Sequence, residues 1–147
     1  MFHFSHALTQ AIRAAGEQSG FAATIKGLFP KQRDYVLCPD AICTNHAARR
    51  SGKSAGNVRR LARKAARHPN GLSFFGAKDL KTCKRIIGPT VREVSQEYDL
   101  GFQWSSQDNA FIAPNGYQIW LIGLSEDGEA DKLRGAAHGL VEGVIDE

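Results

Sequence analysis

The sequence predicts an α/β fold of three layers, in which a mostly parallel β-sheet lies between two layers of helices. Residues 41–46 are a short β-capable run that leads into a polar loop, and a long amphipathic helix follows this loop directly. Residues 72–76 form a compact apolar run, as expected of a buried parallel strand that pairs with the first. Residues 78–98 carry apolar side chains at spacings of three and four, which is typical of a second amphipathic helix.

The helix that follows the loop is strongly divided into an apolar and a basic side. Val58, Leu61 and Ala65 mark the apolar side at helical spacing, and the pattern ends before Pro69-Asn70-Gly71. Cationic side chains occupy the opposite side: Arg59, Arg60, Arg63, Lys64 and Arg67. We therefore expect one helix with a buried face and a basic outer face.

Glycine, proline and asparagine residues indicate where other helices and strands are interrupted or turn. Gly88-Pro89 interrupts the second helix and predicts a kink or two abutting helices, because proline removes a helical hydrogen bond. Asn115-Gly116, between two apolar runs, is the strongest short-range hairpin signal and predicts a strand over 117–122. Residues 5–15 are expected to form a helix, within an N-terminal helical lead-in of residues 1–27 that precedes the main domain at 28–147.

The length of 147 residues suits a domain with a real core, and no apolar run reaches the roughly 18 residues of a membrane span. The first residues lack the charged start and apolar centre of a signal peptide, so we expect a cytoplasmic protein that does not bind membranes. The three cysteines, Cys38, Cys43 and Cys83, form no zinc pattern and are expected to be reduced, mostly buried thiols.

Charge is distributed unevenly along the chain. Residues 49–92 hold 13 Lys and Arg against the single Asp79, whereas residues 93–147 hold 2 Lys and Arg against 11 Asp and Glu. The two halves are therefore expected to attract each other in the fold. A basic middle also suits a polyanionic partner such as DNA, although a solvated helix face would look the same by charge alone.

A candidate phosphate-binding loop lies at residues 47–54, with the sequence Ala-Ala-Arg-Arg-Ser-Gly-Lys-Ser. Its second half matches the phosphate-loop pattern, while Ala47 stands where the first glycine is usual. Gly52 lets backbone N–H groups curl around an anion at a helix N-terminus. Lys53 is predicted to contact the β- and γ-phosphates, and the Ser54 hydroxyl to ligate Mg²⁺. The alternative is a chance Ser-Gly-Lys-Ser in a polar loop.

Two further stretches suit a nucleotide hydrolase. Residues 140–147 are an apolar strand that ends in two carboxylates, of which Asp146 is predicted to hold Mg²⁺ and Glu147 to act as general base. An acidic chain end is the simpler alternative. Gln32, within Leu-Phe-Pro-Lys-Gln-Arg at 28–33, has an amide that both donates to and accepts from an adenine edge, unless it is a surface glutamine in a turn.

Taken together, these motifs resemble the ATPase domain of the large terminase subunit, the DNA-packaging motor of tailed bacteriophages. The resemblance runs from about Leu28 to the end and rests on the order and spacing of several short segments. These are 28–33, 47–54, Asn-Gly-Tyr-Gln-Ile at 115–119, Lys-Leu-Arg-Gly at 132–135, and Glu-Gly-Val-Ile-Asp-Glu at 142–147.

The resemblance implies a P-loop NTPase that uses ATP and Mg²⁺ to move double-stranded DNA into a procapsid in the infected bacterial host. It implies that Gln32 contacts adenine, that Arg50 and Ser51 complete the phosphate loop, and that Arg49 and Arg134 are catalytic. Arg134 would reach the γ-phosphate of a neighbouring subunit, unless it fixes its own loop at a helix end. It also implies self-association into a ring and contacts with the phage portal and the small terminase subunit.

The family continues beyond the acidic pair with further core strands and a nuclease domain. We therefore expect the fold to be incomplete at its C-terminus and the nuclease domain to be absent. Two alternatives stay open: another P-loop nucleic-acid motor, such as a helicase, and a fragment that binds nucleotide or DNA without hydrolysis.

Overall fold

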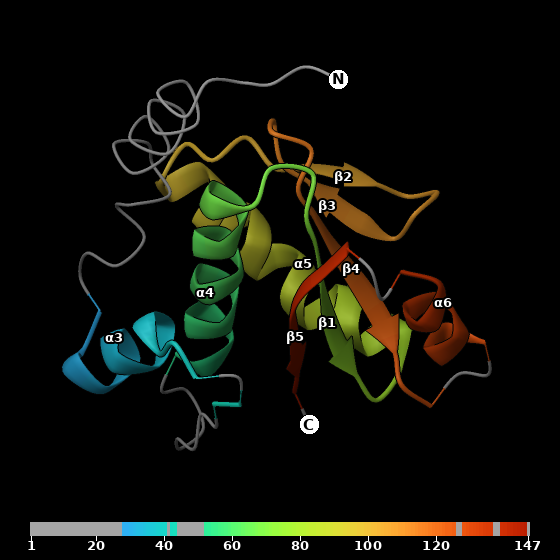
Figure 1. Ribbon diagram of the computed structural model, residues 1–147, viewed down its shortest axis with the longest axis horizontal. Coiled ribbons are helices and arrows are strands. Elements are labelled where there is room, and N and C mark those ends of the chain that lie inside the picture. The colour runs from blue at the N-terminus through green and yellow to red at the C-terminus, as the bar shows by residue number, and fades with distance from the viewer. Residues whose placement is uncertain (1–27, 41, 44–51, 126–127, 137–138, 147) are drawn as a thin grey trace.

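The computed structural model describes residues 28–40, 42–43, 52–125, 128–136 and 139–146. This part of the chain contains both helices and strands, and the strands form one sheet (Figure 1), which confirms the predicted α/β class. The elements are α3 (Pro30–Leu37), α4 (Lys53–Arg67), β1 (Leu72–Ala77), α5 (Leu80–Glu97), β2 (Gln103–Ser105), β3 (Ala110–Ile112), β4 (Gln118–Gly123), α6 (Glu129–Ala136) and β5 (Leu140–Ile145).

The five described strands form one mixed sheet in the order β2-β3-β4-β1-β5. Strand β1 pairs in parallel with β4 on one side and with β5 on the other. Strands β2, β3 and β4 pair antiparallel, as the hairpin signal at Asn115-Gly116 predicted. The sheet thus has as many antiparallel pairings as parallel ones, so the prediction of a mostly parallel sheet holds only for its β4-β1-β5 half.

The predicted pairing of β1 with a strand at 41–46 is wrong. A strand has two hydrogen-bonding edges, and both edges of β1 are occupied, by β4 and β5. Ile42 and Cys43 are described and lie outside any strand, while residues 41 and 44–46 are outside the described part of the chain. The run of β-forming residues at 41–46 could not reveal which strands pair, because pairing is decided by contacts between distant segments.

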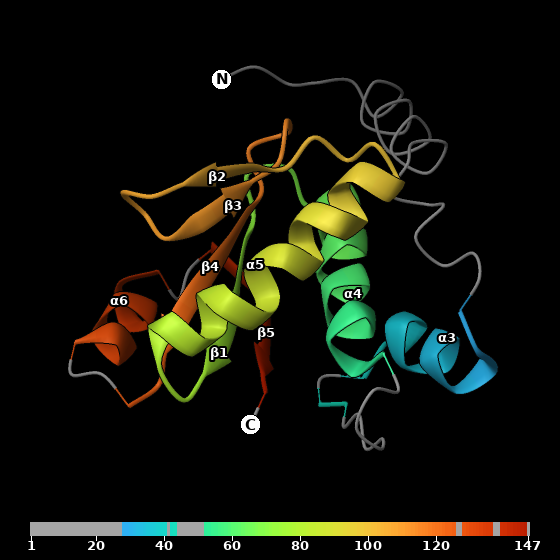
Figure 2. The same ribbon diagram turned by 180° about the vertical axis from the view of Figure 1, so that it is seen from behind.

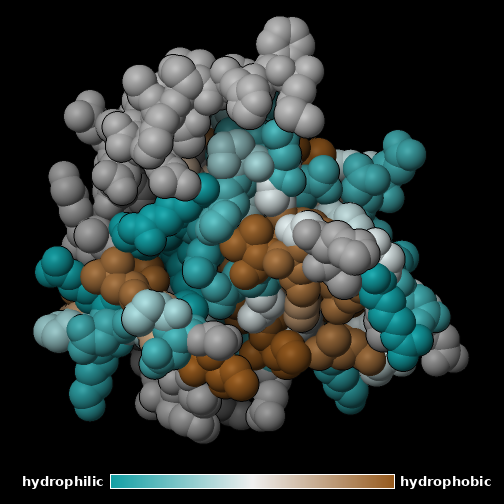
Figure 3. All heavy atoms as spheres, viewed as in Figure 1, coloured by the Kyte–Doolittle hydropathy of each residue, from teal (hydrophilic) through white to brown (hydrophobic). Residues whose placement is uncertain are grey.

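Helices α4 and α5 pack side by side on one face of the sheet and bury a common core with it (Figures 1 and 2). Leu61 of α4, Ile87 of α5 and Phe75 of β1 are at most 1% exposed within this core. Helix α6 lies beside the end of β4, and none of the described helices covers the opposite face of the sheet. The three-layer prediction is therefore not met by the described residues, and hydrophobic atoms gather on the uncovered face (Figure 3).

Helix α5 is continuous through Pro89, so the alternative of two abutting helices is wrong. Its start is fixed by Asp79, whose side chain accepts hydrogen bonds from the backbone N–H and the hydroxyl of Thr82 at 2.7 and 2.8 Å. These two bonds lower the pKa of the Asp79 carboxyl, with the backbone bond the larger cause. This cap satisfies one of the N–H groups of the first turn of α5 and thereby stabilises the start of the helix.

The turn between β3 and β4 is tied to α4 by a side chain. Asn115 donates from Nδ2 to the carbonyl oxygen of Ala65 at 2.7 Å, and its Oδ1 accepts from the N–H of Tyr117 at 3.1 Å. Gly116 follows with a φ of 82°, a conformation that suits glycine. The Asn-Gly pair thus makes the hairpin turn and also anchors it to the end of the basic helix.

The cysteine prediction is wrong for two of the three residues. Cys38 and Cys43 form a disulfide, and Cys83 is the free cysteine among the described residues. Cys83 is buried in the core against α4 and the sheet, as predicted. Burial raises the pKa of its thiol to about 11, so this thiol stays protonated at neutral pH.

Thiol titration tests this assignment. The unfolded chain without reductant is expected to react with one equivalent of a thiol reagent, at Cys83, and with three equivalents after reduction. The folded chain is expected to react very slowly near pH 8, because Cys83 is both buried and protonated there. Three reactive thiols in the unreduced, unfolded chain would show that the disulfide is not formed in solution.

Candidate nucleotide site

Helix α4 begins at Lys53 with an open N-terminus. Gly52 occupies the N-cap position with a φ of 78°, in the left-handed region that favours glycine, and no side chain caps the helix. The carbonyl oxygen of Gly52 already accepts from the N–H of Gly56 at 2.9 Å. The N–H groups of the first turn are thus left for another acceptor, which is the arrangement that binds phosphate at helix N-termini.

Gln32 lies directly against this glycine. Its Nε2 is 2.6 Å from the position that a Cβ on residue 52 would take, so Gly52 is required both by its backbone conformation and by its neighbour. The Oε1 of Gln32 accepts from the N–H of Phe29 at 3.3 Å, inside the first turn of α3. Gln32 is therefore a half-buried helical residue beside the candidate phosphate loop, and the alternative of a glutamine in a surface turn is wrong.

Asp146 follows β5 immediately, and its N–H donates to the carbonyl oxygen of Gly76 at 2.9 Å. This bond extends the β1–β5 pairing by one step and holds the residue at the carboxyl edge of the parallel strands. The first turn of α4 lies at the same edge, since α4 runs opposite to β5 (Figure 1). Lys53, Ser54 and Asp146 therefore lie at the same edge of the sheet, which is the edge where open α/β sheets bind their ligands.

A buried arginine joins the elements that carry these residues. Arg60 of α4 is 2% exposed, and its Nε donates to Oε1 of Glu142 in β5 at 2.9 Å. Its Nη1 donates to the carbonyl oxygens of Tyr35 at 2.7 Å and Cys38 at 3.1 Å, in and just after α3. Arg60 thus holds α3 and β5 against α4, and it was not among the residues that the sequence indicated as functional.

The basic side of α4 differs from the predicted free cationic face. Besides Arg60, Lys64 pairs with Glu142 at 3.3 Å, and Arg59 pairs with Glu97 at 3.7 Å and lies over the ring of Tyr98. These pairs join the basic half of the chain to its acidic half, as the charge distribution predicted. For the same reason Arg59, Arg60 and Lys64 are engaged within the fold, and among the cations of α4 Arg67 is exposed.

Two groups of predicted residues are not part of this geometry as described. Arg49, Arg50, Ser51 and Glu147 lie outside the described residues. Arg134, on α6, has a side chain that is 84% exposed and an Nη1 that is 2.9 Å from Oδ1 of Asp131. Helix α6 lies across the sheet from α4 (Figure 1), so Arg134 does not meet Lys53 within one chain. Its suggested action on a neighbouring subunit stays a prediction.

Helix α4 also carries a buried polar atom, one turn after its start, that the sequence did not single out. The Oδ1 of Asn57 is buried and has no hydrogen-bond partner among the described residues. Asn57 lies one helical turn after Lys53 and Ser54, and it is 5% exposed. A buried acceptor without a donor is costly, which suits a place where a ligand or water donates the missing bond.

The oxygen ligands that Ser54 and Asp146 offer resemble the usual ligands of Mg²⁺ in proteins. In the described part of the chain no three His, Cys, Asp or Glu residues gather as a metal cluster. Mg²⁺ in nucleotide sites is held by one or two protein oxygens together with waters and substrate phosphates. Ser54 and Asp146 supply oxygens of that kind, so they fit an ion that arrives with a nucleotide better than a permanently bound metal.

Comparison of the chain with protein-family models, with curated proteins and with solved structures finds no match. The interpretation of the site therefore rests on its residues and geometry. No helix in the described segments is long and apolar enough to cross a membrane.

Replacement of Arg60 tests its role as the joint between α3, α4 and β5. Arg60→Ala leaves Glu142 and two carbonyl oxygens without their buried donor, and we expect a loss of about 3–5 kcal/mol in the free energy of unfolding. Arg67→Ala, at an exposed position of the same helix, is expected to change it by less than about 0.5 kcal/mol. Urea unfolding measures both values, and equal small effects would show that the buried pairing is not formed.

Proposed function

We propose that this chain binds Mg-ATP at the edge formed by the start of α4 and the end of β5, and that it is the ATPase part of a phage DNA-packaging motor of the terminase type. The contact of Gln32 with Gly52 is the observation that carries the proposal. It brings the predicted adenine-binding residue to the predicted phosphate loop, although 20 positions separate them in the sequence.

Each of the predicted site residues named below has a distinct role in this proposal. The first-turn N–H groups of α4 and the Lys53 ammonium bind the β- and γ-phosphates, and the Gln32 amide faces the base. Ser54 and Asp146 hold Mg²⁺, directly or through water, and the ion neutralises charge that develops on the phosphates. Glu147, next to Asp146 in the sequence, accepts a proton from the attacking water as general base.

Double-stranded DNA is the proposed partner, with sequence-independent attraction to phosphates. The structure changes which cations are available for it. Arg59, Arg60 and Lys64 pair with acids of the same chain, whereas exposed cations without a described ion pair lie at Arg67 and along α5. The ring assembly, the portal and the small terminase subunit are proposed on the resemblance alone, as is the host cytoplasm.

Lys53→Ala is expected to lower the affinity for Mg-ATP by at least about a hundredfold, because charge-assisted bonds to the phosphates are lost. Isothermal titration calorimetry measures this change directly. The matched control is Lys78→Ala, an exposed lysine in the turn between β1 and α5, which is expected to bind as the parent does. Unchanged affinity in Lys53→Ala would contradict the phosphate cradle.

The acidic pair is tested by separating metal dependence from turnover. Asp146→Asn is expected to reduce the gain in ATP affinity that Mg²⁺ gives over EDTA, because a metal-binding carboxylate is lost. Glu147→Gln is expected to keep that gain and to lower hydrolysis by about a hundredfold or more, as for loss of a general base. The two roles would be wrong if Asp146→Asn kept the full magnesium effect or if Glu147→Gln hydrolysed ATP at the parent rate.

A further inference from the structure

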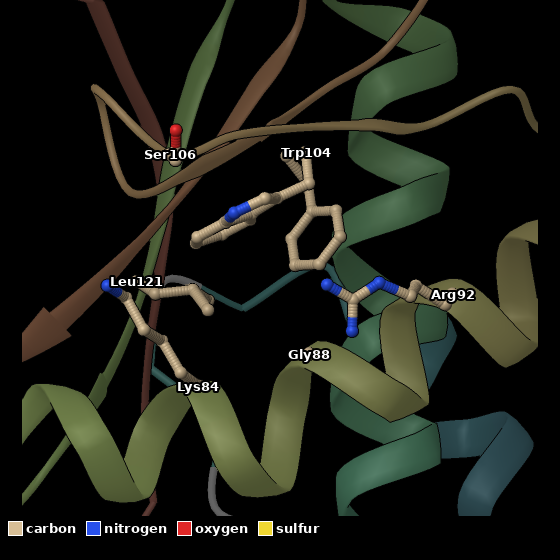
Figure 4. Close-up of a pocket in the computed structure, with 7 residues that line it drawn as sticks. Lys84, Gly88, Arg92, Trp104, Ser106 and Leu121 are labelled. Atoms are coloured by element: carbon tan, nitrogen blue, oxygen red, sulfur yellow. The ribbon is translucent and has the colours of Figure 1, made fainter.

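A cleft of about 180 Å³ lies between α5 and the β2–β3 hairpin, on the side of the helix that faces the strands (Figure 4). Trp104, Phe111 and Leu121 form its apolar wall, and the rings of Trp104 and Phe111 are 4.9 Å apart. Gly88 forms its floor on α5, and a Cβ added there would meet only the Arg92 side chain, at 3.6 Å. The cleft is therefore open because a glycine faces an aromatic wall.

Two cations flank this wall, and neither has an acidic partner among the described residues. The Nζ of Lys84 lies 5.7 Å from the centre of the Trp104 ring, and the Cζ of Arg92 lies 5.7 Å from the centre of the Phe111 ring. Neither makes an ion pair with a described residue, and the indole N–H of Trp104 makes no hydrogen bond to one. The cleft thus combines aromatic faces with cations that lack an anion, which favours a planar anionic ligand.

The size of the cleft and its surroundings distinguish between such ligands. Sites that enclose a whole small molecule usually measure about 300–1,000 Å³, so this cleft suits a single ring system rather than a complete nucleotide. Exposed cations continue beyond it along one side of α5, at Lys81 and Arg85. From Lys81 to Arg92 the helix rises about 16 Å, which is long enough for more than one phosphate of a strand.

We propose that this cleft binds an unpaired nucleotide of a nucleic-acid strand. The base enters between Trp104 and the α5 backbone at Gly88, and Lys84 and Arg92 turn from the aromatic rings to the adjoining phosphates. Proteins hold single strands by this combination of an aromatic stacking surface and a cationic groove. The cleft is formed without Lys53 or Asp146, so the proposal stands independently of the ATP site.

The experiment measures tryptophan fluorescence of the full chain, without ATP or Mg²⁺, during titration with a short oligothymidylate. We expect saturable quenching that weakens steeply with salt. Trp104→Leu is expected to lower the affinity about tenfold or more, and Gly88→Leu, which fills the cleft from the helix side, is expected to do the same. For these variants, binding is followed by anisotropy of a labelled oligonucleotide.

Three further ligands decide what occupies the cleft: an abasic oligomer of equal length, a blunt duplex and free thymidine monophosphate. All three are expected to bind weakly to the unsubstituted protein. Trp104→Leu is expected not to lower the affinity for the abasic oligomer any further. Tight binding of the duplex or the abasic oligomer would contradict the insertion of a base into the cleft. Binding of the monophosphate as tight as that of oligothymidylate would contradict the proposal that the ligand is a nucleic-acid strand.

Substitutions of exposed cations provide a further comparison, because they leave the buried core unchanged. Lys84→Gln and Arg92→Gln are each expected to weaken oligothymidylate binding and to reduce its salt dependence, whereas Lys31→Gln, an exposed cation on α3, is expected to do neither. Equal effects of all three substitutions would mean that attraction is spread over the basic surface and would overturn the localised site.

Discussion

The arrangement of this structure depends on one buried guanidinium. Arg60 reaches α3 through two carbonyl oxygens and β5 through Glu142, and Lys64 adds a second cation to the same carboxylate. A buried charge of this kind is costly unless every donor finds an acceptor, so α3 and β5 are held where those acceptors meet it. Gln32 lies on α3 and Asp146 four residues after Glu142, whereas Lys53 and Ser54 open the helix that carries Arg60. The contacts of Arg60 thus fix how the residues of the candidate nucleotide site lie relative to one another. Arg60 itself is about two helical turns from the start of α4, where the phosphates would bind.

Sequence periodicity predicted α4 and α5 because each presents apolar side chains to one core at helical spacing, and Asn115-Gly116 predicted the hairpin because its turn conformation favours those residues. Strand pairing was not predictable in this way. The sequence of β1 is an apolar run, and this pattern would be the same whichever strands lay beside it. Its two partners, β4 and β5, lie about 45 and 70 residues later in the chain. Gly52, Lys53 and Ser54 were found from a local motif, but the contact of Gln32 with Gly52 depends on how α3 packs and has no local signal. Arg60 looked like a surface cation because its acceptor, Glu142, is 82 positions away.

The same long-range pairing changes where positive charge is available. Counting Lys and Arg along the chain favours α4 as the polyanion-binding helix, yet three of its cations are neutralised by Glu97 and Glu142. Helix α5 keeps its cations because its own acids, Glu93 and Glu97, lie near its end, beyond the turns that face the hairpin. Lys84 and Arg92 meet aromatic rings instead, and an exposed cation–π contact is weak enough, at about 0.5–1 kcal/mol, to give way to a phosphate. The cationic surface that α4 presents after folding is therefore smaller than its sequence suggests, whereas α5 keeps exposed cations beside Trp104 and Phe111.

The sheet face that no described helix covers raises a separate physical question, because apolar side chains there would be expected to remain in contact with water. Two glycines reduce this exposure. A Cβ on Gly143 would lie 2.4 Å from the Phe74 ring, and one on Gly76 would lie 3.1 Å from Leu124, so both side chains lie flat over neighbouring backbone. Ile122, on the adjacent strand, is only 2% exposed. Ile145 remains 65% exposed, however, because β5 has β1 on one side and no described strand on the other. Two exposed apolar side chains of the sheet, Leu140 and Ile145, thus lie on the edge strand β5, where an additional strand or helix would bury apolar area by packing.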